Sequence, residues 1–152
     1  MTESNSPLDT LIDLARDSRD QAGQALAGEQ RTAQQVAEQL AALSGYRQEY
    51  ADKLNAAMRD GIDPATMRNY QQFLASLDEA LERARRAVAA QEQRVDRTRQ
   101  QWLHEQRRLS SYDTLAERRA REQERRELRR EQNISDDLVN SRMARCPRRG
   151  EP

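Results

Sequence analysis

Apolar residues recur at alternating spacings of three and four along two long stretches of the chain. From residue 8 to 57, twelve of the fifteen positions reached by this spacing are apolar or Tyr, and from 67 to 116 the ratio is the same. Such a 3.5-residue repeat, held over about seven heptads, is typical of a coiled coil. We call these the seam positions: Leu8, Ile12, Ala15, Arg19, Ala22, Leu26, Glu29, Ala33, Val36, Leu40, Leu43, Arg47, Tyr50, Leu54 and Ala57 in the first stretch, and Met67, Tyr70, Leu74, Leu77, Leu81, Ala84, Val88, Gln91, Val95, Thr98, Trp102, Glu105, Leu109, Tyr112 and Ala116 in the second.

One strong helix breaker lies between the two stretches. Gly61 can adopt the left-handed conformation that often ends a helix. Asp63 is a good N-cap for the next helix, and Pro64 fits its first position. We therefore expect an all-α fold with a turn at about Gly61 to Pro64. Two helices, at about 8–60 and 64–131, are predicted to form an antiparallel coiled-coil hairpin.

A turn centred on this breaker also predicts the pairing of the two helices. Folding about Ile62 pairs residue i with residue 124 − i, which places Arg19 opposite Glu105 and Ala22 opposite Trp102. These two matches, one of charge and one of size, favour this register over a slip of one heptad.

The second stretch is longer than the first and is expected to overhang it. Residues 117–131 hold seven Arg and five Glu, and Glu–Arg pairs four residues apart can support such a helix without a core. Ser135 is a plausible cap for a last short helix at 136–145. The prediction is one helical domain over 1–145, followed by a disordered tail at 146–152.

Composition argues against an enzyme and against a membrane span. The 152 residues include one His and one Cys, and neither has neighbours suited to a nucleophile or a metal site. There is no glycine-rich phosphate loop, no apolar run of about 20 residues and no signal-peptide core. A single Cys146 fits a reducing cytoplasm. We expect no catalysis, cofactor, metal or small-molecule ligand.

Charge is balanced overall but is unequally distributed. Residues 1–82 carry a net charge of −7 and residues 83–149 a net charge of +8. Two segments of opposite sign favour self-pairing over nucleic-acid binding, so no nucleic acid is expected as a partner. The arginines of the overhang have no paired helix and face either an acidic protein surface or water.

Two aromatic residues near the turn lie beside the seam rather than in it. Tyr46 and Phe73 occupy the same flank, in a chain that has only six aromatic residues. Exposed aromatics of this kind suggest a binding face. The alternative is that they only cover the ends of the seam.

Three runs near the turn carry a family resemblance. They are Gln39-Leu40-Ala41-Ala42-Leu43-Ser44-Gly45-Tyr46-Arg47-Gln48-Glu49-Tyr50, then Gly61-Ile62, then Asn69-Tyr70-Gln71-Gln72-Phe73-Leu74. They resemble runs at matching intervals in the flagellar FliJ family, and the resemblance covers essentially the whole chain, including Asp136-Asp137-Leu138 near its end.

The resemblance implies a cytoplasmic component of the flagellar type III export apparatus, peripherally associated with the inner membrane at the flagellar base. Proteins of this family form a hairpin similar to the central γ stalk of rotary ATPases. They insert into the hexameric export ATPase, promote its assembly and activity, link it to the membrane export gate and bind export chaperones.

The resemblance also implies two sets of site residues. The gate-binding face would comprise Gln39, Leu43, Tyr46, Tyr50, Phe73, Leu77 and Ala80. The family's His at the next position of this face is Ala84 here. By analogy with the rotary stalk, the ATPase-binding set would comprise Leu8, Leu11, Ile12, Arg16, Leu138, Val139 and Met143, at the other end of the hairpin.

Three other functions remain open at this point. The chain is also compatible with the stalk of a virulence-type III secretion ATPase, although the motif runs favour flagella. It is compatible with a structural coiled-coil rod that self-assembles, which light scattering would detect. An arginine-helix nucleic-acid binder would show binding that falls steeply with salt.

Overall fold

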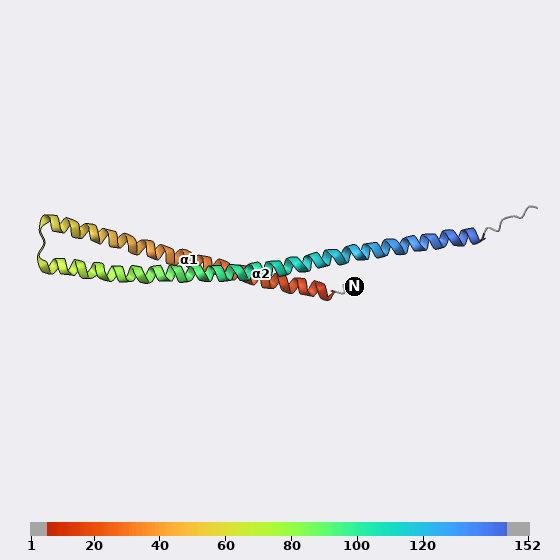
Figure 1. Ribbon diagram of the computed structural model, residues 1–152, viewed down its shortest axis with the longest axis horizontal. Helices are drawn as coiled ribbons and strands as arrows, with labels where there is room; N and C mark the ends of the chain where they lie inside the picture. Colours follow the sequence, from red (N-terminus) through yellow and green to blue (C-terminus); the bar gives the residue numbers. More distant parts are fainter. Residues whose placement is uncertain (1–5, 146–152) are drawn as a thin grey trace, which may run out of the picture. The chain divides into compact units, whose positions relative to one another are not determined.

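Two helices account for nearly all of the chain that the structure describes, residues 6–145 of a computed structural model. Helix α1 spans Pro7–Asp60 and helix α2 spans Pro64–Arg145 (Figure 1). No strand occurs within these residues. The prediction of an all-α hairpin of two long antiparallel helices is confirmed.

Helix α1 begins with a reciprocal cap. The Asp9 backbone N–H donates to the Ser6 hydroxyl, and the Ser6 backbone N–H donates to the Asp9 carboxylate, both at 3.3 Å. Pro7 takes the first helical position, where a missing N–H costs nothing. These contacts satisfy donors that would otherwise be unpaired, and they start the helix one residue before the predicted Leu8.

The turn has the predicted geometry. Gly61 has a positive φ of 90°, and Asp63 caps α2 by accepting a 3.2 Å hydrogen bond from the Thr66 backbone N–H. The Asp63 carbonyl accepts the first helical bond, from Met67. Hydrogen bonds from the Thr66 side chain and backbone hold the pKa of the Asp63 carboxyl below its usual value.

The seam is occupied as the repeat predicts. All thirty seam positions are buried or half-buried. The apolar residues with the lowest exposure are Leu8, Ile12, Ala15, Leu77, Leu81 and Leu109, at 3–9%. Two facing helices bury only one stripe each, so the protein has a narrow core, in which no described side chain falls below 2% exposure.

The chain divides into two compact units. Unit 1 combines residues 1–14 with 107–152, and unit 2 comprises residues 15–106. The single-domain expectation stays a prediction, and each unit is described below by itself.

In unit 2, three cross-helix contacts match the predicted register to within one residue, whereas the contact of Gln91 with Glu29 is displaced by four residues. The rings of Tyr50 and Phe73 are 4.4 Å apart. The Arg47 guanidinium bonds Asp78 at 3.0 Å. A Cβ added at Gly23 would lie 3.4 Å from the Trp102 indole, so glycine lets α1 approach this large ring closely.

Two polar seam layers in unit 2 behave differently. Gln91, 6% exposed, donates to the Glu29 carbonyl at 3.0 Å and also to the Glu29 carboxylate. Arg19 was predicted to lie opposite Glu105. Its guanidinium instead forms an ion pair with the neighbouring Asp20, at 2.9 Å. Glu105 accepts from Gln101 and keeps one buried oxygen without a hydrogen-bond partner.

In unit 1, α2 continues well past the residues that α1 covers. Every residue from 117 to 145 is exposed, and no ion pair within 4.0 Å involves an arginine of 117–131 in the described structure. The expected Glu–Arg pairs are therefore not formed, and good helix formers extend the helix instead.

The end of α2 also differs from the prediction of a separate short helix. Helix α2 runs without a break through Ser135 to Arg145. No Gly or Pro interrupts residues 128–145, and extending a formed helix by one residue is far easier than nucleating a new one. The predicted disordered tail, 146–152, lies outside the described residues.

Candidate interaction surfaces

An aromatic cluster lies beside the turn in unit 2. Tyr50 of α1 and Phe73 of α2 contact each other with their rings tilted by 52°. The Lys53 ammonium lies 4.9 Å from the centre of the Tyr50 ring, within the range of a cation–π interaction. Tyr50, Phe73, Thr66, Asn69 and Tyr70 line an open hollow of about 250 Å³.

The predicted gate-binding residues fall into two groups by exposure. Tyr46 and Phe73 are 54% and 42% exposed, and Gln39 is also exposed. The remaining four belong mainly to the seam: Leu77 is buried, and Leu43, Tyr50 and Ala80 are half-buried. The first group is accessible to a partner, whereas substitutions in the second group also disturb the packing of the two helices.

Three residues of this hollow were not among the predicted gate-binding residues. They are Thr66, Asn69 and Tyr70, all from the first turns of α2. Asn69 and Tyr70 belong to the run that carries the family resemblance, so a signal was present in the sequence. Thr66 lies three residues after the predicted cap Asp63, but no pattern in the sequence marked it as part of a binding surface.

The predicted ATPase-binding residues of α1 also differ in how exposed their side chains are. Leu8 and Ile12 are buried at 6% and 8%, whereas Leu11 is 41% exposed and Arg16 is exposed. Leu8 and Ile12 therefore hold α1 against α2. Leu11 is the apolar side chain of this predicted set that a partner can reach, and the neighbouring Leu14 is 58% exposed.

The predicted ATPase-binding residues of α2 lie on uncovered helix. Leu138, Val139 and Met143 are 61%, 49% and 72% exposed. Leu8 faces a groove whose other wall ends at Arg130, and Leu138 lies eight residues further on, about 12 Å along the helix. The structure does not bring the two parts of this predicted set together.

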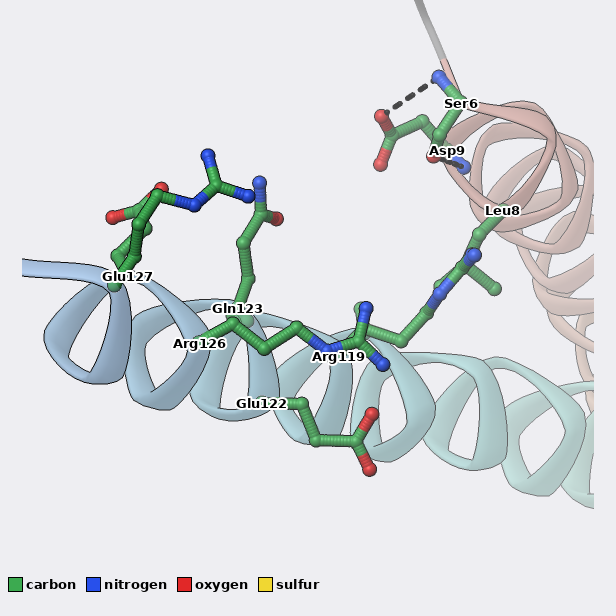
Figure 2. A pocket seen from close by; sticks show the side chains of 11 residues that line it. Ser6, Leu8, Asp9, Arg119, Glu122, Gln123, Arg126 and Glu127 are labelled. Carbon is green, nitrogen blue, oxygen red and sulfur yellow. Dashed lines mark hydrogen bonds between the residues drawn. The ribbon is translucent and has the colours of Figure 1, made fainter. Parts of the chain in front are cut away.

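That groove lies within unit 1. It has a volume of about 700 Å³ and lies between the first turn of α1 and residues 116–130 of α2. Figure 2 shows the capped start of α1, with Ser6 and Asp9, on one side and the charged side chains of α2 on the other. Leu8, Ala116 and Ala120 are its apolar lining. Its charged side chains are the cationic Arg119, Arg126 and Arg130 and the anionic Asp9, Glu122 and Glu127.

Together, the two surfaces are lined by apolar, polar and charged side chains of both signs. No group of three His, Cys, Asp or Glu side chains able to hold a metal ion occurs in residues 6–145. Within the same residues, no helix is long and apolar enough to cross a membrane. An aromatic hollow and a groove lined by arginines and carboxylates are suited to binding proteins by apolar and charged contacts.

Comparisons with known proteins agree with these features. The family model described as "Flagellar FliJ protein" matches residues 4–148. The flagellar FliJ proteins of Salmonella typhi and Escherichia coli (strain K12) are each 34% identical to the chain over 140 residues, which covers 92% of the chain and 95% of each relative. A match of this extent includes both helices and the turn. The chain belongs to the flagellar FliJ protein family.

Proposed function

We propose that the chain is a stalk-like activator of flagellar protein export. In this role it inserts into the ring of the export ATPase, links the ring to the membrane export gate and binds export chaperones, without catalysing a reaction itself. Membership of the flagellar FliJ family supports a flagellar export component, and it favours flagella over a virulence-type secretion system.

One observation carries the finer proposal: a helical hairpin with separate apolar and cationic surfaces. The aromatic cluster of Tyr50 and Phe73 beside the turn is suited to an apolar segment of the gate protein. The exposed last turns of α2, with Leu138 and Met143, are suited to the ATPase. On this proposal, the chain works in the cytoplasm, peripherally associated with the inner membrane.

The main test is ATP hydrolysis by the purified export ATPase of the same bacterium, with and without the chain. Stimulation together with ring assembly is expected, with loss of both when residues 1–16 or 135–152 are deleted. The second deletion is the cleaner of the two, since residues 135–145 are exposed throughout, whereas the first removes buried Leu8 and Ile12. A competent ATPase that does not respond to the full chain contradicts the proposal.

The gate contact is tested separately by pull-down with the cytoplasmic linker of the gate protein. Tyr46→Ala and Phe73→Ala should weaken this binding, because both side chains are exposed beside the turn. Leu115→Ala is the matched control, as it removes an apolar side chain that is 46% exposed elsewhere on α2. Equal effects of all three substitutions would argue against a specific aromatic face.

A further inference from the structure

One face of α2 is covered by α1 only as far as Ala116, and the same face continues beyond it. Helix α1 begins at Pro7, and Leu8 lines the groove together with Ala116. The spacing of the seam, continued along α2, reaches residues 119, 123, 126 and 130. These positions hold Arg, Gln, Arg and Arg, so the uncovered part of this face is cationic rather than apolar.

Three arginines of this face form a single line. At 3.6 residues per turn, Arg119, Arg126 and Arg130 fall within about 40° of arc, and we call them the arginine stripe. All three are exposed and line the groove, as do the carboxylates of Asp9, Glu122 and Glu127. In Figure 2, Arg119 extends toward Leu8, whereas Glu122 points away from α1.

The arginine stripe differs from a second line of arginines on the same stretch of helix. Arg118, Arg125 and Arg129 lie about 100° further around α2. They are equally exposed but do not line the groove. The overhang therefore presents two sets of three guanidinium groups, of which one continues the seam face and the other does not.

The charge of α1 indicates what kind of element would suit the uncovered face. Residues 1–82 carry a net charge of −7, and the first turns of α1 contain Asp9, Asp13 and Asp17. The helix that covers α2 is therefore acidic at the point where the cover stops. A helix that packed on α2 beyond the start of α1 would remove water from the arginine stripe. It would therefore have to supply carboxylates, because burying unpaired guanidinium groups is unfavourable in free energy.

We propose that the arginine stripe binds an acidic helical segment of a partner protein, laid along α2 from Ala116 to Arg130 in the place that α1 leaves open. Its carboxylates would recur about one heptad apart, because Arg119 and Arg126 are seven residues, or about 10 Å, apart along the helix. The small side chains of Ala116 and Ala120 allow the backbone of the partner to approach closely. The proposal rests on the proposed function, under which this partner is the export ATPase.

The test compares two triple variants of the full chain. The stripe variant is Arg119→Gln, Arg126→Gln and Arg130→Gln, and its control is Arg118→Gln, Arg125→Gln and Arg129→Gln. Each removes three positive charges from nearly the same residues, and Gln is a good helix former. Since all six arginines are exposed, circular dichroism should show the same helix content and unfolding midpoint for both variants and for the unaltered chain.

Binding to the purified ATPase, and its stimulation, are then measured at low and at high salt. The stripe variant should bind at least about tenfold more weakly, with a flatter salt dependence, because it lacks several interfacial charge pairs. The control variant should stay within about twofold of the unaltered chain, since charges outside an interface contribute little.

The possible failures are distinguishable. If the unaltered chain neither binds nor stimulates the ATPase, the proposed function is overturned, and the assignment of this partner with it. If the unaltered chain binds but the two variants lose affinity equally, the proposed function stands and the stripe is overturned. Duplex DNA is the last probe, and salt-sensitive DNA binding that only the stripe variant loses would identify a nucleic-acid site instead.

Discussion

Helix α2 contains a region that α1 covers and a region that it does not, within one unbroken element. In the covered region Leu109 is 3% exposed, whereas Leu128 in the uncovered region is 64% exposed. The uncovered region is no less helical than the covered one. Helix formation and helix pairing therefore have different causes in this chain, the first being local propensity and the second the spacing of the apolar residues.

The spacing explains why the cover stops where it does. Up to Ala116 twelve of the fifteen seam positions of α2 are apolar or Tyr, whereas Leu128, Ile134 and Leu138 fall outside the continued seam positions. Arg119 and Arg126 occupy the next seam positions. If α1 began earlier, its added turns would pack against these arginines. The point at which α1 begins therefore coincides with the end of the apolar repeat of α2.

The largest effect expected from this comparison concerns two leucines. Leu81→Ala should lower the free energy of unfolding by about 2–4 kcal/mol, because its side chain, 5% exposed, leaves a cavity in the narrow core. Leu128→Ala should change it by less than about 0.5 kcal/mol. Urea denaturation followed by far-ultraviolet circular dichroism measures both values. A similar loss in both variants would mean that the exposed region is covered in solution.

A smaller effect is expected at two glutamines in the seam phase. Gln91→Ala should lower the free energy of unfolding by about 1–3 kcal/mol, because the part-buried Glu29 loses the amide that bonds it. Gln123→Ala, in the same phase but beyond the cover, should have almost no effect. The same denaturation experiment compares them. A negligible loss at Gln91 would show that its bond to Glu29 does not stabilise the pairing.

The smallest effect concerns two positions that both resemble helix starts. Asp63→Ala should lower the midpoint of thermal unfolding at pH 7, because the carboxylate caps α2 by accepting a hydrogen bond from Thr66. Asp136→Ala should leave this midpoint unchanged, because Asp136 lies within the unbroken helix and caps nothing. The pKa of Asp63 is lowered by folding, so its contribution is complete above the usual carboxyl pKa. It declines below pH 3.8 and vanishes below the lowered pKa.

Thermal scans from pH 7 downward check this sign. The difference between Asp63→Ala and the unaltered chain should close as the solution becomes acidic. A difference that persists at the lowest pH would show that the carboxylate is not what stabilises this turn.

Features that depend on residues near in sequence were predictable. The turn followed from Gly61, Asp63 and Pro64, whose preferences agree with one another. The seam followed from a repeat long enough to exclude an ordinary surface helix. The cap at Ser6 was available from the same kind of signal, because Pro7 follows it and an acidic residue lies three positions on.

Features that depend on competition between contacts were not predictable in this way. Ser135 resembles a cap, but α2 runs through it without a break, because extending a helix is easier than nucleating a new one. Arg19 was predicted to face Glu105, but it bonds the neighbouring Asp20. The aromatic hollow was predictable only in part. Tyr50 and Phe73 were among the predicted gate-binding residues, whereas Thr66, Asn69 and Tyr70 were not.

The close approach of Gly23 to Trp102 gives the protein a natural optical reporter. The sequence contains a single tryptophan, and its half-buried indole lies against α1 in unit 2. Fluorescence of the purified chain, excited selectively at the indole, therefore reports on one layer of the seam without any label. A partner that parts the two helices there will shift the emission to longer wavelength, whereas one that binds only the outer surfaces will leave the spectrum unchanged.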